Sequence, residues 1–179
     1  MKKIKQFLTV FAAIFGIAAF FASNAEAQRR DYLTEDEIEI VRDAQEIDLR
    51  VKVLTRAVER RLAVINNQPL KEKEIWGAPP KGSRVELFLD IEKLIQKAID
   101  DVDETASRAK ESKLFPKAVH QFADSCTEYL PQFKTFLDTT KDEKERGALL
   151  GAAENCNQVI EAAAKIPKEP TKEEKKNNY

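Results

Sequence analysis

The sequence has few of the residues that enzymes and cofactor proteins commonly use. Its 179 residues include one histidine, one methionine, two cysteines and five glycines. It contains no phosphate-binding glycine loop, no Cys-x-x-Cys pair and no Cys-x-x-Cys-His haem-attachment motif. The Glu-x-x-His repeats of di-iron helical bundles are also missing. We therefore expect no catalytic activity and no cofactor.

An excess of positive charge is also missing. The chain has 30 Lys and Arg residues against 31 Asp and Glu residues, a net charge of −1. Without residues 1–27 it would keep 27 basic and 30 acidic side chains, a net charge near −3. A slightly acidic protein has no general attraction to nucleic acid. We therefore expect no nucleic-acid partner.

Residues 1–27 have the layout of a secretory signal peptide. Lys2, Lys3 and Lys5 precede an uncharged, mostly apolar run over 7–21, and Ala25-Glu26-Ala27 is typical of a cleavage site. Fifteen helical residues rise about 22 Å, whereas a helix needs roughly 20 residues to cross a bilayer. We predict cleavage after Ala27, export to the periplasm or secretion, and no stable membrane insertion after cleavage.

The rest of the chain predicts an all-α protein. Glycine is rare, while Ala, Glu, Lys, Leu and Ile are frequent, which favours helix over strand. Apolar residues at helical spacing predict four helices, over about 34–66, 84–110, 113–138 and 141–166. We expect one domain, 28–166, folded as an antiparallel (up-down-up-down) four-helix bundle. Residues 167–179, which are charged and lack apolar side chains, are expected to be a disordered tail.

Local signals place the helix ends. Thr34 with Glu37, and Ser83 with Glu86, form capping boxes. No proline or glycine interrupts 34–66, so we predict one helix there, followed by an irregular connection over 67–82. Pro131 lies inside the third helix, whose apolar stripe stays in phase on both sides. A break at 128–130 is the alternative.

Cys126 and Cys156 are the only cysteines. Each lies fifteen residues from Lys141, which marks the turn between the predicted third and fourth helices. If these helices fold back on each other, both cysteines lie about 22 Å from the turn and face each other. In an oxidising compartment such a pair forms a disulfide. We predict a structural disulfide joining helices 3 and 4. Two buried free thiols or a redox-active pair are the alternatives.

Two further sets of residues are candidates for contacts. Trp76, Phe136, Arg56 and Arg60 are a candidate contact surface, because Phe136 falls off the main stripe and the two arginines share a helix face. Arg61 occupies an apolar seam position of the first helix. We predict a buried ion pair between Arg61 and Glu86 or Asp90, unless Arg61 extends outward to water.

The densest acidic cluster is Asp100, Asp101, Asp103 and Glu104. It lies on a helix without a glycine turn, unlike a calcium-binding loop, so we interpret it as a solvated face with a local Glu104–Arg108 pair. His120 is likewise interpreted as an ordinary, partly exposed residue.

These patterns together favour an exported, non-catalytic helical bundle that acts as a binding or structural module through its surface. An unknown protein partner, or self-association through the long first helix, would fit. One alternative is a carrier of a small apolar ligand or cofactor in the bundle core. The other is a metal-assisted enzyme that uses the Asp100–Glu104 cluster.

Overall fold

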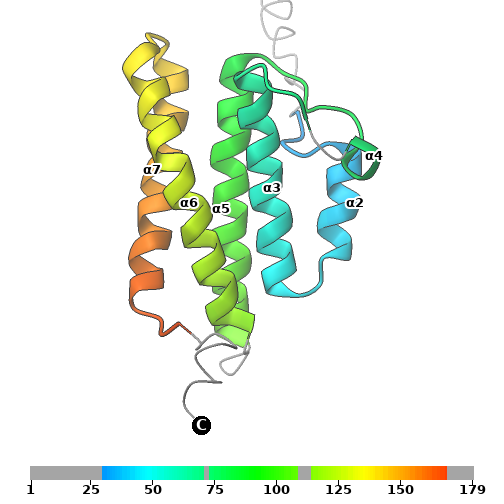
Figure 1. Cartoon of the computed structure of the whole chain (residues 1–179), viewed down its shortest axis with the longest axis vertical. Coiled ribbons are helices and arrows are strands. Elements are labelled where there is room, and N and C mark those ends of the chain that lie inside the picture. Colours follow the sequence, from blue (N-terminus) through cyan, green and yellow to red (C-terminus); the bar gives the residue numbers. More distant parts are fainter. Residues whose placement is uncertain (1–29, 71–72, 109–113, 169–179) are drawn as a thin grey trace, which may run out of the picture. The chain divides into compact units, whose positions relative to one another are not determined.

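The structure, a computed structural model, describes residues 30–70, 73–108 and 114–168. In these ranges it contains helices and no strand, which confirms the all-α prediction. The helices are α2 (Glu35–Asp43), α3 (Ile47–Ile65), α4 (Lys73–Trp76), α5 (Arg84–Arg108), α6 (Leu114–Thr139) and α7 (Glu143–Ala164) (Figure 1). Within the described ranges, no helix combines the length and the apolar character needed to cross a membrane.

Some predictions fall outside the described residues. These are the signal peptide over 1–27, the helix ends at 109–110 and 113, and residues 169–179 of the predicted tail. Residues Tyr32–Tyr179 form one compact unit, and the fold below is that of its described part.

Helices α3, α5, α6 and α7 pack together as a helical bundle. α6 lies against α7 and α3, and α5 lies against α3 and α7 (Figure 1). Each helix turns an apolar stripe inward, and burying one large aliphatic or aromatic side chain stabilises the fold by about 1.5–3 kcal/mol. The fully buried large side chains include Leu54 of α3, Phe88, Ile91 and Leu94 of α5, Phe122 and Phe133 of α6, and Leu149 of α7.

The predicted single helix over 34–66 is wrong. The chain leaves helical geometry at Ala44, with φ −75° and ψ 83°, and resumes it at Ile47. α2 lies beside α3 after the chain has reversed its direction at this turn (Figure 1). The cause is a set of contacts that hold the first turn of α2 against the last turns of α3, described below.

Other local predictions are confirmed. Both capping boxes form: Glu37 N–H donates to Thr34 Oγ1, and Glu86 N–H donates to Ser83 Oγ. α6 continues through Pro131 without a break. The 67–82 connection contains the one-turn helix α4, and the remainder of its described part is irregular.

Candidate functional site

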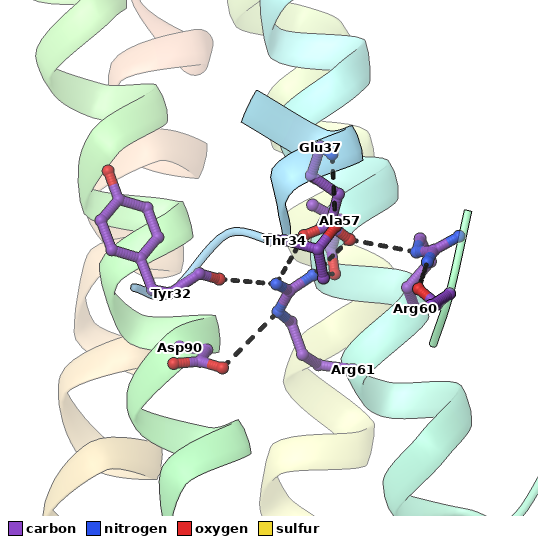
Figure 2. Close-up of polar contacts among 8 residues, drawn as sticks. Tyr32, Thr34, Glu37, Ala57, Arg60, Arg61 and Asp90 are labelled. Atoms are coloured by element: carbon purple, nitrogen blue, oxygen red, sulfur yellow. Dashed lines mark hydrogen bonds and ion pairs between the residues drawn. The ribbon is translucent and has the colours of Figure 1, made fainter. Parts of the chain in front are cut away.

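A buried ion cluster joins the start of α2 to the end of α3 (Figure 2). The Glu37 carboxylate is fully buried and accepts hydrogen bonds from Arg61 Nη1 at 2.8 Å and Arg61 Nη2 at 2.6 Å. Arg60 Nε lies 3.0 Å from Glu37 Oε1. The capping box orients this carboxylate, because Glu37 also accepts the N–H of Thr34. Removing one partner would leave an uncompensated buried charge, which is strongly destabilising.

Arg61 makes three further contacts. Its Nη1 donates to the carbonyl of Ala57 at 2.9 Å, and its Nη2 donates to the carbonyl of Tyr32 at 2.5 Å. Its Nε lies 3.8 Å from Oδ2 of Asp90, one of the two partners considered for Arg61 in the sequence (Figure 2). Glu86, the other predicted partner, accepts the backbone N–H of Ser83.

The main partner of Arg61 was missed at the sequence level. In one continuous helix, Glu37 and Arg61 would lie about 36 Å apart, because 24 residues rise 1.5 Å each. Only the reversal of the chain at the α2–α3 turn brings them together.

Arg60 is 2% exposed and connects this cluster to α4. Its guanidinium lies over the Trp76 ring, 5.4 Å from the centroid, and its Nη2 donates to the carbonyl of Ala78 at 2.6 Å. In the described part of the chain, its Nε and Nη1 have no hydrogen-bond partner. Burial lowers the pKa of Arg60 from its ordinary value, and the nearby Glu37 carboxylate opposes that shift. The stack on Trp76 is a cation–π contact.

Gly77 fixes the segment after α4 against α2. Its φ of +62° lies in the left-handed region, and a Cβ there would come 1.8 Å from Asp36 Oδ2. Only glycine suits both constraints without strain or a shift of Asp36. α2, the end of α3 and α4 therefore form one connected corner of the protein.

A groove of about 770 Å³ lies beside this corner, along α3, α4 and α6. Its lining includes Leu49, Lys52, Val53 and Arg56 of α3, Ile75 and Trp76 of α4, and Gln121 and Ser125 of α6. Leu49 is 50% exposed and Ile75 is 68% exposed. Lys52 is exposed, and Arg56 pairs with Glu59 at 2.5 Å. The groove thus offers aliphatic contact area with a cation at its wall.

The predicted contact surface is mostly buried. Trp76 is 6% exposed and Phe136 is 8% exposed, so the expectation that they lie at the surface is wrong. Phe136 packs against Phe88, with ring centroids 5.2 Å apart, and Arg84 covers its ring. Arg60 is buried in the ion cluster, while Arg56 is half-buried and lines the groove.

The exposed apolar residues of the groove were missed. Leu49 lies between the seam residues Ile47 and Val51, out of phase with the buried stripe. An apolar residue on a polar helix face is a sequence signal that could have found it. Ile75 carried no comparable signal, because it lies in an irregular connection.

Cys126 and Cys156 lie next to each other between α6 and α7, both fully buried, as free thiols. The pair is 2.9 Å apart, longer than the S–S bond of about 2.05 Å. A hydrogen bond in which the Cys126 thiol donates to Cys156 raises the pKa of Cys126, and burial adds to this effect. A thiol with a raised pKa is a poor nucleophile.

The acidic cluster is divided among separate contacts. Asp101 is buried and pairs with Arg50 at 3.1 Å and with Lys97. The predicted Glu104–Arg108 pair is present at 2.7 Å. In the described residues, no three His, Cys, Asp or Glu side chains are grouped as a metal ion would require.

His120 lies on α6, where its Nε2 is 2.9 Å from the carbonyl oxygen of Ile166. The side chain is half-buried, so the contact connects α6 to the segment that follows α7.

A second cavity, of about 210 Å³, lies among α5, α6 and α7. Its lining is mainly apolar, with Asp103 and Gln158 as polar members. The apolar part of the lining consists of Ile99, Val102, Phe115, Val119, Phe122, Val159, Ala162 and Ile166.

Comparisons with models of protein families, with curated proteins and with solved structures gave no match for this chain.

Proposed function

We propose that this is an exported, non-catalytic protein that binds a protein partner through the groove along α3, α4 and α6. The observation that carries the proposal is the exposure of two large aliphatic side chains, Leu49 and Ile75, on one groove. Exposed apolar patches rimmed by polar residues mark interaction sites. The export signal predicted over 1–27 places the partner in the periplasm or outside the cell.

The groove favours a partner segment with aliphatic side chains and a carboxylate. Leu49 and Ile75 supply apolar contact, and Lys52 supplies an exposed positive charge on the same wall. Glu59 already neutralises Arg56, so the charged side chains of this wall keep a net positive charge. A rim charge of this kind steers the approach of an acidic partner and sets its register.

The bundle that carries this groove is proposed to be an antiparallel four-helix bundle with a Cys126–Cys156 disulfide after export. The contact of the two thiols supports the disulfide, because little movement separates them from bonding distance. Oxidation by the thiol–disulfide systems of the export compartment would remove two electrons and two protons from the pair.

The test compares a groove variant with a surface control. The full chain is cross-linked in its own compartment, and captured partners are identified by mass spectrometry. The double variant Leu49→Ser/Ile75→Ser should lose the partner, because each buried aliphatic side chain contributes about 1.5–3 kcal/mol.

The control is Leu150→Ser. Leu150 is 54% exposed, lies on α7 and does not line the groove, so this variant should keep the partner. Equal capture by both variants would show that the groove is not the binding surface.

A second candidate function rests on the cavity among α5, α6 and α7: the carriage of a small apolar ligand. The pocket is open to the surface, because Asp103, Gln158 and Ala162 of its lining are exposed. Asp103 and Gln158 would accept a hydrogen bond from a hydroxyl head group of the ligand.

Octanol is a suitable test ligand, with binding measured by calorimetry. Ala162→Phe places a larger side chain in the cavity, so that several CH₂ groups of octanol can no longer be buried. This variant should bind octanol at least about tenfold more weakly. Ala164→Phe, on an exposed position of the same helix that does not line the cavity, should bind octanol like the unchanged chain. No heat of binding to the unchanged chain would exclude this function for alcohols of this size.

A further inference from the structure

One turn of α3 forms a part of the groove that is both apolar and positively charged. Leu49, Lys52 and Val53 all line the groove, and their spacing of three and four residues puts them on the same side of the helix. Leu49 is 50% exposed, Val53 is half-buried and Lys52 is exposed. Lys52 makes no ion pair with another described residue. This turn therefore has apolar surface and a positive charge available to a partner.

α4 carries the complementary pair of side chains. Glu74 and Ile75 are neighbours on this one-turn helix. Both are exposed, Ile75 by 68%, and Glu74 makes no ion pair with another described residue. They are thus a carboxylate and an aliphatic side chain, the two features that the groove favours in a partner. Ile75 also lines the groove, so one surface of the protein carries both complementary parts.

α4 presents these two side chains from a fixed position. The neighbouring Trp76 is buried, and the Arg60 guanidinium lies over its ring, 5.4 Å from the centroid. Gly77 lies against the side chain of Asp36. α4 is therefore already ordered before it meets a partner, which lowers the entropy cost of binding.

We propose that the groove partner is a second copy of the chain, an inference that rests on the proposed function. The two copies are related by a two-fold axis, and α4 of each copy enters the groove of the other. Ile75 then packs against Leu49 and Val53 of the other copy, and Glu74 pairs with its Lys52. The axis makes each contact occur twice, so the dimer is closed and does not grow into a filament.

The charges of this surface favour a second copy over an unrelated protein. In the dimer, Lys52 and Glu74 balance each other, and both contacts use groups that have no ion-pair partner within one chain. An unrelated protein would have to supply a carboxylate for Lys52 and a cation for Glu74 at the same spacing. The same dimer removes the exposed side chains of Leu49 and Ile75 from water, which favours association.

The test reverses each charge separately in the protein recovered after export. Lys52→Glu brings two carboxylates together at both contacts of its dimer, and Glu74→Lys brings two ammonium groups together. Both positions are exposed, so circular dichroism should show two folded variants. Analytical ultracentrifugation at low ionic strength should show a concentration-dependent dimer of the unchanged chain. Each variant alone should dimerise at least about tenfold more weakly.

An equimolar mixture of the two variants is the decisive sample. In the mixed dimer each contact again joins a carboxylate to an ammonium group, so the mixture should dimerise about as strongly as the unchanged chain. Labelling one variant with heavy nitrogen identifies the mixed dimer by its mass. Lys141→Glu and Glu154→Lys are the matched controls. They make the same charge reversals at exposed positions outside the groove, and each should dimerise alone like the unchanged chain.

A monomer at all concentrations would overturn the proposal. A dimer that Leu49→Ser/Ile75→Ser leaves intact, or a mixture that dimerises no better than its two components, would also overturn it. These measurements use the purified chain alone. A chain that stays monomeric but captures a different protein through the groove would therefore overturn the dimer and leave the proposed function standing.

Discussion

At the scale of single residues, Glu37 connects the start of α2 to the end of α3 through one carboxylate. It accepts the N–H of Thr34 at the start of α2, and it pairs with both Arg60 and Arg61 near the end of α3. All of these contacts are made where the carboxylate has no exposed surface. Water therefore cannot replace the protein partners of the Glu37 carboxylate.

Glu37→Gln should lower the free energy of unfolding by about 3–5 kcal/mol, because it leaves two buried guanidinium groups without their main counter-charge. Urea unfolding followed by circular dichroism measures the change. Glu39→Gln is the control: it makes the same substitution on the same helix, but its pair with Arg42 is exposed on both sides. That control should change stability by no more than about 1 kcal/mol. Equal losses in the two variants would contradict a special role for the buried carboxylate.

Some residues of the site could be predicted from the sequence and others could not. The Arg61–Asp90 contact was predictable, because Arg61 interrupts an apolar seam and Asp90 lies near the start of the neighbouring helix. The Arg61–Glu37 contact was not, because it requires a chain reversal without a local signal. Trp76 and Phe136 were predicted to lie at the surface. The sequence does not show that the side chains of Arg60 and Arg84 cover their rings.

At the scale of elements, the helices with strong local signals were predicted most accurately. α5 begins directly after the Ser83 capping box, and α6 spans Pro131 because its apolar stripe continues in phase. The error lies at 44–46, where propensity and periodicity both favour a helix. Burial of the Glu37 cluster outweighs both of these local preferences.

At the scale of the whole molecule, the two cysteines link the helix pair that carries the weakest features of the bundle. α6 contains Pro131, which cannot donate a backbone hydrogen bond, and α7 packs mainly through small residues such as Ala148, Ala152 and Ala163. Equal spacing from Lys141 predicted that Cys126 and Cys156 would be neighbours, and the structure places them in contact. The covalent bond itself remains a prediction.

Closing a loop of roughly 30 residues with a disulfide is worth on the order of 3–4 kcal/mol in the chain-entropy model. We therefore expect reduction to loosen α6 and α7 before α3 and α5. Hydrogen exchange read by mass spectrometry, with and without reductant, would show faster exchange first in residues 114–164. Cys126→Ala/Cys156→Ala, which cannot form the bond, should exchange alike in both conditions. Alkylation of both thiols in the exported protein without reductant would show that no disulfide forms. Uniformly faster exchange in all four helices after reduction would show that the bond stabilises the bundle as a whole, because α6 and α7 would then unfold only together with α3 and α5.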